Sequence, residues 1–208
     1  MKTMIKLLAV LAIAMATFSQ HTTASAGSVF HFKGKGADAF FSTIDSSGCI
    51  FTDVFVFASE EIFQNPPGPR SASSGTFLFI SQYDTCTNTL LLSADGFTSL
   101  GDPDFQATRK LNSATLIATV NVHDGVSDSF FDVFVDLAWT GTGPLNRQNG
   151  RFHFHSPGCT QNSHFNSTFR PAEASGSVSD GATNFTPDTS LGAGIFSAKN
   201  GDVVVGCN

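Results

Sequence analysis

The chain has 208 residues, of which 41% are apolar and 13% are charged. That length and apolar share are enough for one substantial folded domain, and they exclude a disordered chain. The formal net charge is −6, and lysine and arginine form no cluster along the sequence. We therefore expect neither a nucleic-acid partner nor an anionic-membrane partner.

Residues 1–26 are predicted to be a secretory signal peptide. Lys2 and Lys6 give the start of the chain a positive charge, residues 7–16 form an apolar run, and residues 24–26 (ASA) form a small-residue cleavage site. The run is shorter than the roughly 20 residues that cross a bilayer, and no later segment reaches that length, so we expect no membrane span. The protein is therefore expected to be secreted, either to the extracellular space or to a periplasm.

Four cysteines follow the predicted signal peptide. An even number in an exported chain predicts two disulfides, for which three pairings are possible. Because no two of them form a C-x-x-C pair, the sequence indicates neither a zinc knuckle nor a thioredoxin-like redox site. The four are Cys49, Cys86, Cys159 and Cys207.

The chain after residue 26 is predicted to be all-β. Runs rich in Phe, Val, Ile and Thr are separated by Gly, Ser, Asn, Asp and Pro, and no segment has the 3.6-residue apolar period of a helix. Strands are predicted over residues 50–58, 76–81, 115–122, 130–140 and 151–155. Residues 50–58 are apolar on both faces, which is typical of strands enclosed by other layers. We predict one domain over residues 27–208, an antiparallel β-sandwich or a closed barrel of about ten strands.

The two halves of this domain share a spaced pattern, which predicts two diverged tandem repeats over about residues 28–105 and 106–200. Chance similarity between short Phe/Val strands is the alternative. The matched segments are 51–58 with 130–137, the Gly-Pro-x5-Gly motifs at 68–75 and 143–150, and Cys86-Thr87 with Cys159-Thr160.

The repeat also predicts how the cysteines pair. If the strand at 76–81 runs antiparallel to the strand at 50–58, Cys86 lies beside Cys49. By the same logic, a C-terminal strand at 203–205 brings Cys207 to Cys159. We therefore expect the pairs Cys49–Cys86 and Cys159–Cys207.

One face of the strands is predicted to be apolar in the first repeat and polar in the second. Residues are assigned to faces here because alternate residues of a strand lie on the same side. Four apolar residues of the first repeat (Phe57, Leu78, Ile80 and Leu91) correspond to four polar ones in the second, namely Asp136, His153, His155 and His164. With a hairpin loop at 156–161, His153 faces His164 across the strands. Three imidazoles and a carboxylate would suit one ion of Zn, Fe, Mn or Cu with an open coordination position.

Two other interpretations of these residues stay open: the face is turned to solvent, or the residues form a buried, hydrogen-bonded cluster. No nucleophile elbow or phosphate-binding loop is present. We therefore expect a secreted protein that binds a small molecule, a glycan or a surface. The alternative is a metal-dependent hydrolase or oxidoreductase, with His153, His155 and His164 as ligands and Asp136 as a fourth ligand or general base.

Overall fold

The computed structural model describes residues 28–64, 68–98, 104–156, 159–186 and 189–205. This part of the chain is all-β, as predicted, and each of the five predicted segments lies within a strand. The predicted signal peptide lies outside the described residues. The strands are β1 (Ser28–Ile44), β2 (Ile50–Gln64), β3 (Arg70–Asp84), β4 (Thr89–Phe97), β5 (Asp104–Ala107), β6 (Ser113–Asp124), β7 (Ser129–Gly141), β8 (Asn146–Ser156), β9 (Cys159–Ser179) and β10 (Gly192–Val205).

All ten strands pair antiparallel in a single sheet, in the order β10-β1-β2-β3-β4-β6-β7-β9-β8, with β5 on the edge of β6. β9 pairs with β10 as well, so that the path of paired strands returns to its start. The weakest link in this path is the contact between β4 and β6, which consists of three residue pairs. The described residues contain no helix long and apolar enough to cross a membrane.

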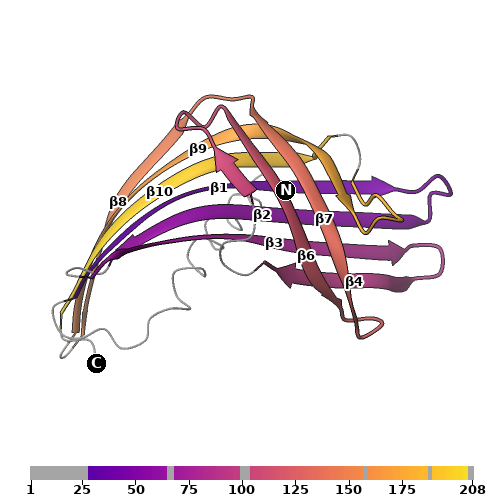
Figure 1. Ribbon diagram of the computed structural model, residues 1–208, viewed down its shortest axis with the longest axis horizontal. Coiled ribbons are helices and arrows are strands. Elements are labelled where there is room, and N and C mark those ends of the chain that lie inside the picture. The colour runs from indigo at the N-terminus through magenta and orange to yellow at the C-terminus, as the bar shows by residue number, and fades with distance from the viewer. Residues whose placement is uncertain (1–27, 65–67, 99–103, 157–158, 187–188, 206–208) are drawn as a thin grey trace.

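The path of paired strands closes on itself in one part of the sheet, which we call the closed part. The core lies on the face that the strands turn toward one another there, which we call the inner face. β6 and β7 bury every second residue there, as the alternation of branched apolar residues predicts. Figure 1 shows β6 and β7 crossing β1, β2 and β3 at a steep angle. Trp139 of β7 is fully buried at this crossing, and its indole Nε1–H donates to the backbone oxygen of Asp38 on β1 at 2.8 Å.

Beyond this crossing the sheet continues as an open layer. Figure 1 shows β8, β9, β10, β1, β2 and β3 running on together toward one end. We call this part, made of residues 31–36, 59–64, 70–75, 146–156, 160–170 and 197–201, the sheet extension. Its inner face is the continuation of the face that forms the core, since strand alternation runs unbroken from one part to the other.

The strand pairing does not show the predicted duplication. β2 pairs with β3 along its whole length, whereas β7 pairs with β6 and β9, and β8 pairs with β9. The face assignment of the first half was also wrong. Val56, and not Phe57, lies opposite Leu78, so that Phe57 and Leu78 are on opposite faces of the sheet. Period 2 assigns faces within one strand, but only the register relates two strands.

The disulfide between Cys49 and Cys86 is confirmed, with a Cα–Cα distance of 5.3 Å. It forms for the predicted reason: β2 and β3 pair antiparallel, and the pairing of Ile50 with Asp84 brings the strand ends together. Cys159 begins β9, while Cys207 lies outside the described residues, so the second pair stays a prediction.

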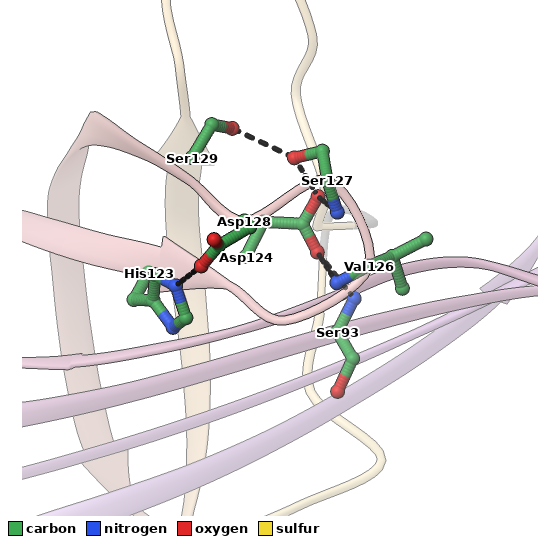
Figure 2. A network of polar contacts seen from close by, with 7 residues as sticks. All are labelled: Ser93, His123, Asp124, Val126, Ser127, Asp128 and Ser129. Atoms are coloured by element: carbon green, nitrogen blue, oxygen red, sulfur yellow. Dashed lines mark hydrogen bonds and ion pairs between the residues drawn. The ribbon is translucent and has the colours of Figure 1, made fainter.

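A carboxylate holds the narrow β4–β6 contact together. Asp124, at the end of β6, accepts hydrogen bonds from the backbone N–H groups of Ser93 on β4 (3.1 Å), Val126 (3.0 Å) and Ser127 (3.2 Å), as Figure 2 shows. The Ser127 hydroxyl donates to the same carboxylate. Burial acts to raise the pKa of Asp124, but these hydrogen bonds outweigh it and lower the pKa to about 2.

Replacing Asp124 with asparagine is expected to destabilise the fold by about 1–3 kcal/mol at pH 7, because charge-assisted hydrogen bonds are lost at the closure point. A carboxyl whose folded pKa is depressed stabilises the fold above its unfolded pKa, and this contribution is lost as pH falls. The free energy of unfolding of the wild type should therefore fall toward that of Asp124→Asn between about pH 4 and pH 2. Urea unfolding followed by circular dichroism at several pH values measures this, and a pH-independent difference would contradict it.

Candidate functional site

The inner face of the sheet extension is polar, in contrast to the apolar core that it continues. Its residues line up in rows across five strands, β2, β1, β10, β9 and β8, because the registers match. Nearest the core the row is Glu60, Lys35, Ser197, Thr168, Arg147; the next is Ile62, Lys33, Lys199, Asn166, Asn149; the third is Gln64, His31, Gly201, His164, Arg151. Each row spans about 19 Å at the usual strand separation.

Basic residues collect on this face. The chain has 11 lysines and arginines, and Lys2 and Lys6 belong to the predicted signal peptide. Seven of the other nine lie on the inner face, while Arg109 and Lys110 lie in the turn between β5 and β6. We call this surface the basic face; its seven members are Lys33, Lys35, Arg70, Arg147, Arg151, Arg170 and Lys199.

Two of these lysines oppose each other directly. Lys33 on β1 and Lys199 on β10 are cross-strand partners and both are exposed. Side chains in such a pair start about 5 Å apart, and like charges in this arrangement are destabilising. Neither has an acidic partner among the described residues. Lys35, by contrast, is neutralised by Glu60 at 3.1 Å, and its ammonium group also donates to the backbone oxygen of Ala107 at 2.8 Å.

A hollow of about 510 Å³ lies where the basic face meets the closed part of the sheet. Lys33, Lys35 and Glu60 line one part of it, while Ile62 and the buried ring of Phe105 on β5 provide apolar walls. Both charged and apolar groups therefore line this hollow.

The three predicted metal ligands share the inner face, but the structure does not bring their nitrogens together. The hairpin register differs by two residues from the predicted one, so that His153 opposes Asn162 and His164 opposes Arg151. A register shift of two residues leaves each side chain on the same face of the sheet and changes the residue that lies opposite it. The Nδ1 atom of His153 lies 2.6 Å from Oδ1 of Asn162, and Nδ1 of His155 lies 3.0 Å from Oγ1 of Thr160.

Asp136 is far from these histidines. It is exposed on the outer face of β7, between the buried Val135 and Leu137. Its cross-strand neighbour Ser177 is 13 residues from His164 along β9, or about 40 Å of strand. Asp136 therefore cannot complete a site with the three histidines, and its prediction as a fourth ligand or base for them is wrong.

Among the described residues, the group whose ligand atoms lie close enough for one ion is Cys49, Asp84 and Cys86. Both sulfurs of this group belong to the disulfide, so no thiolate is available to bind a metal. A carboxylate alone then remains, and this group is no candidate metal centre.

Sequence reasoning missed the basic face, although part of its signal was visible. His31, Lys33 and Lys35 alternate at period 2, as do Arg151, His153 and His155, and such alternation indicates one polar strand face. What the sequence could not reveal is that β1, β10, β9 and β8 lie side by side. The absence of a basic cluster along the chain therefore did not mean its absence in space.

No protein-family model and no curated protein matches the chain. Among solved structures it is similar to a Nitrosomonas europaea protein provisionally described as AttH, with a TM-score of 0.32 and 10% sequence identity. The alignment covers 92% of this chain and 56% of that one. The chain thus spans little more than half the length of that protein.

Proposed function

We propose that this is an exported binding protein that holds an acidic glycan on the basic face. The observation that carries the proposal is the gathering of seven basic residues on one face of a chain whose net charge is negative. The opposed pair Lys33 and Lys199 supports it, because an anion placed between two like charges relieves their repulsion.

Export is supported by the predicted signal peptide and by the Cys49–Cys86 disulfide, since such bonds persist in oxidising compartments. The second predicted pair, Cys159–Cys207, belongs to the same proposal. A mass-spectrometric map of the mature protein tests it, and the predicted peptide pair should disappear on reduction.

A glycan is favoured over a small inorganic anion because the basic face also carries uncharged hydrogen-bonding groups. Asn166 and Asn149 continue the row of Lys33 and Lys199, and Thr168 lies in the row nearest the core. Amide and hydroxyl groups both donate and accept hydrogen bonds, which suits sugar hydroxyls, while ammonium and guanidinium groups suit sugar carboxylates. The apolar walls of the adjacent hollow, Ile62 and Phe105, would suit the apolar side of a sugar ring.

The test is binding of polygalacturonate, a carboxylated glycan, to the wild type and to Lys33→Gln/Lys199→Gln. We expect the double variant to bind about tenfold more weakly, because each exposed charge contact contributes up to about 1 kcal/mol. Affinity should fall as salt is raised, since exposed charges are screened. Titration calorimetry measures both effects.

The matched control is Arg109→Gln/Lys110→Gln, which removes the same charge outside the basic face and should bind like the wild type. Equal weakening by both double variants would show attraction by net charge alone and contradict the site. Duplex DNA bound as tightly as polygalacturonate would overturn the glycan assignment, and neutral dextran should not bind. Metal in the purified protein that is lost in His153→Ala/His164→Ala would instead favour the metal-enzyme alternative.

A further inference from the structure

β8 forms an edge of the sheet. In the part of the chain that the structure describes, it pairs with β9 on one side and with no strand on the other. It is 11 residues long, and none of its residues is buried. One row of backbone N–H and C=O groups along β8 therefore faces outward, ready to accept a further strand.

The side chains of β8 alternate between two chemistries. Phe152 and Phe154 stand on the outer face, 53% and 44% exposed. Arg147, Arg151 and His153 stand on the inner face. An added strand places its own side chains alternately beside these two sets, since the side-chain period of a strand is 2. The complementary sequence therefore alternates apolar and acidic residues.

Charge disfavours a second copy of this chain that would pair with β8 through the same edge. Two β8 edges joined to each other would bring arginines of both copies to the same inner face. Another open edge among the described residues is the first part of β3, residues 70–75, which β4 does not cover because its pairing begins at Phe77. The charged residue in that segment is Arg70, so this edge does not complement β8 either.

We propose that β8 is a docking edge for an extended acidic segment of another protein, which adds to the sheet as a strand. Backbone hydrogen bonds supply attachment, Phe152 and Phe154 contact the apolar residues of the segment, and Arg147 and Arg151 contact its carboxylates. The arginines have a second effect, because they oppose edge-to-edge pairing between copies of the protein. The basic face includes Arg147 and Arg151, but the two proposals are tested at different residues: the glycan proposal at Lys33 and Lys199, and this one at Arg147 and Arg151.

The experiment uses the full mature protein and three synthetic nine-residue peptides: alternating Val and Glu, alternating Val and Lys, and a Val/Glu peptide of scrambled order. Calorimetry should show the alternating acidic peptide binding at least tenfold more tightly than either of the others. Hydrogen exchange should show new protection of the amides of residues 146–156 in that complex. Equal binding of the scrambled peptide, or new protection confined to other strands, would overturn the proposal.

Charge reversal provides the decisive variant. Arg147→Glu/Arg151→Glu should prefer the Val/Lys peptide over the Val/Glu peptide by a similar factor. Arg109→Glu/Lys110→Glu carries the same change in net charge away from β8 and should keep the wild-type preference. Unchanged preference in the β8 variant would overturn the proposal, as would a free protein that sediments as a dimer with β8 already protected.

Discussion

Replacing Asp38 with asparagine is expected to leave stability near pH 4 unchanged and to raise it by about 4 kcal/mol at pH 7.5. Burial raises the pKa of this carboxyl to about 7, and Asp38 is only 7% exposed. Its Oδ1 atom has no hydrogen-bond partner among the described residues. An ionised form would therefore be a buried charge without compensation, which is costly.

The burial of Asp38 has a clear origin in the aromatic outer face. Phe57 of β2 and Phe196 of β10 flank β1, and their rings stack over it with centroids 5.7 Å apart. The cross-strand partner of Asp38 on β10 is Gly194. A Cβ atom at that position would lie 2.2 Å from the ring of Phe169 and 3.2 Å from Oδ1 of Asp38, so the ring and the carboxyl fill the space that a side chain would take.

The sign of the pH effect follows from the raised pKa. Between about pH 4 and pH 7 the unfolded chain has lost this proton while the folded chain keeps it, so stability falls by about 1.4 kcal/mol per pH unit. The Asp38→Asn variant has a neutral amide at this position at every pH, so it lacks this contribution. Urea unfolding between pH 4 and pH 8.5 should give two curves that diverge up to about pH 7 and then run parallel.

Two further variants make this result decisive. Asp38→Val is also neutral at this position. Its stability should therefore lack the same pH-dependent contribution, even if the new side chain changes the absolute stability. Asp136→Asn removes an exposed carboxylate from the same outer face and controls for loss of charge. If the stability difference between the wild type and Asp38→Asn stays constant from pH 4 to pH 8.5, the buried carboxyl is not linked to folding.

Replacing Trp139 with alanine should destabilise the protein by about 3–5 kcal/mol, the usual cost of deleting a large buried aromatic side chain. The ring is 1% exposed. It joins β7 to β1 through its hydrogen bond to the backbone oxygen of Asp38. Because this is the single tryptophan of the chain, far-UV circular dichroism during urea unfolding is the suitable measurement.

Trp139→Phe separates packing from hydrogen bonding at this site. It keeps most of the buried area but leaves the Asp38 carbonyl without its indole donor, so we expect a loss of about 1–3 kcal/mol. A loss as large as that of the alanine variant would mean that the hydrogen bond dominates. No loss would mean that this carbonyl finds another partner.

Local patterns predicted the strands well. The segment at 115–122 alternates between apolar and polar residues except at Ile117, and β6 buries every second residue as that alternation predicts. The Cys49–Cys86 disulfide was predictable for the same reason, because it depends on one hairpin between neighbouring strands. These features depend on residues close together in the sequence.

The candidate site could be predicted only in part. That His153, His155 and His164 share a face followed from alternation, yet their partners depended on the hairpin register, which differed by two residues. Asp136 was assigned to their neighbourhood through an alignment of the two halves. That alignment carried no information about which strands lie side by side.

By itself, the sequence determined that the described chain is built from antiparallel strands with alternating faces, because side-chain direction in a strand repeats every two residues. Which residues from other strands lie beside each face was decided by the tertiary structure alone. The order of β8, β9, β10, β1, β2 and β3 collects the basic residues onto one surface, and rings from β2, β9 and β10 lie around Asp38. Both outcomes depend on residues far apart in the chain, and their proximity is fixed by packing rather than by any local pattern.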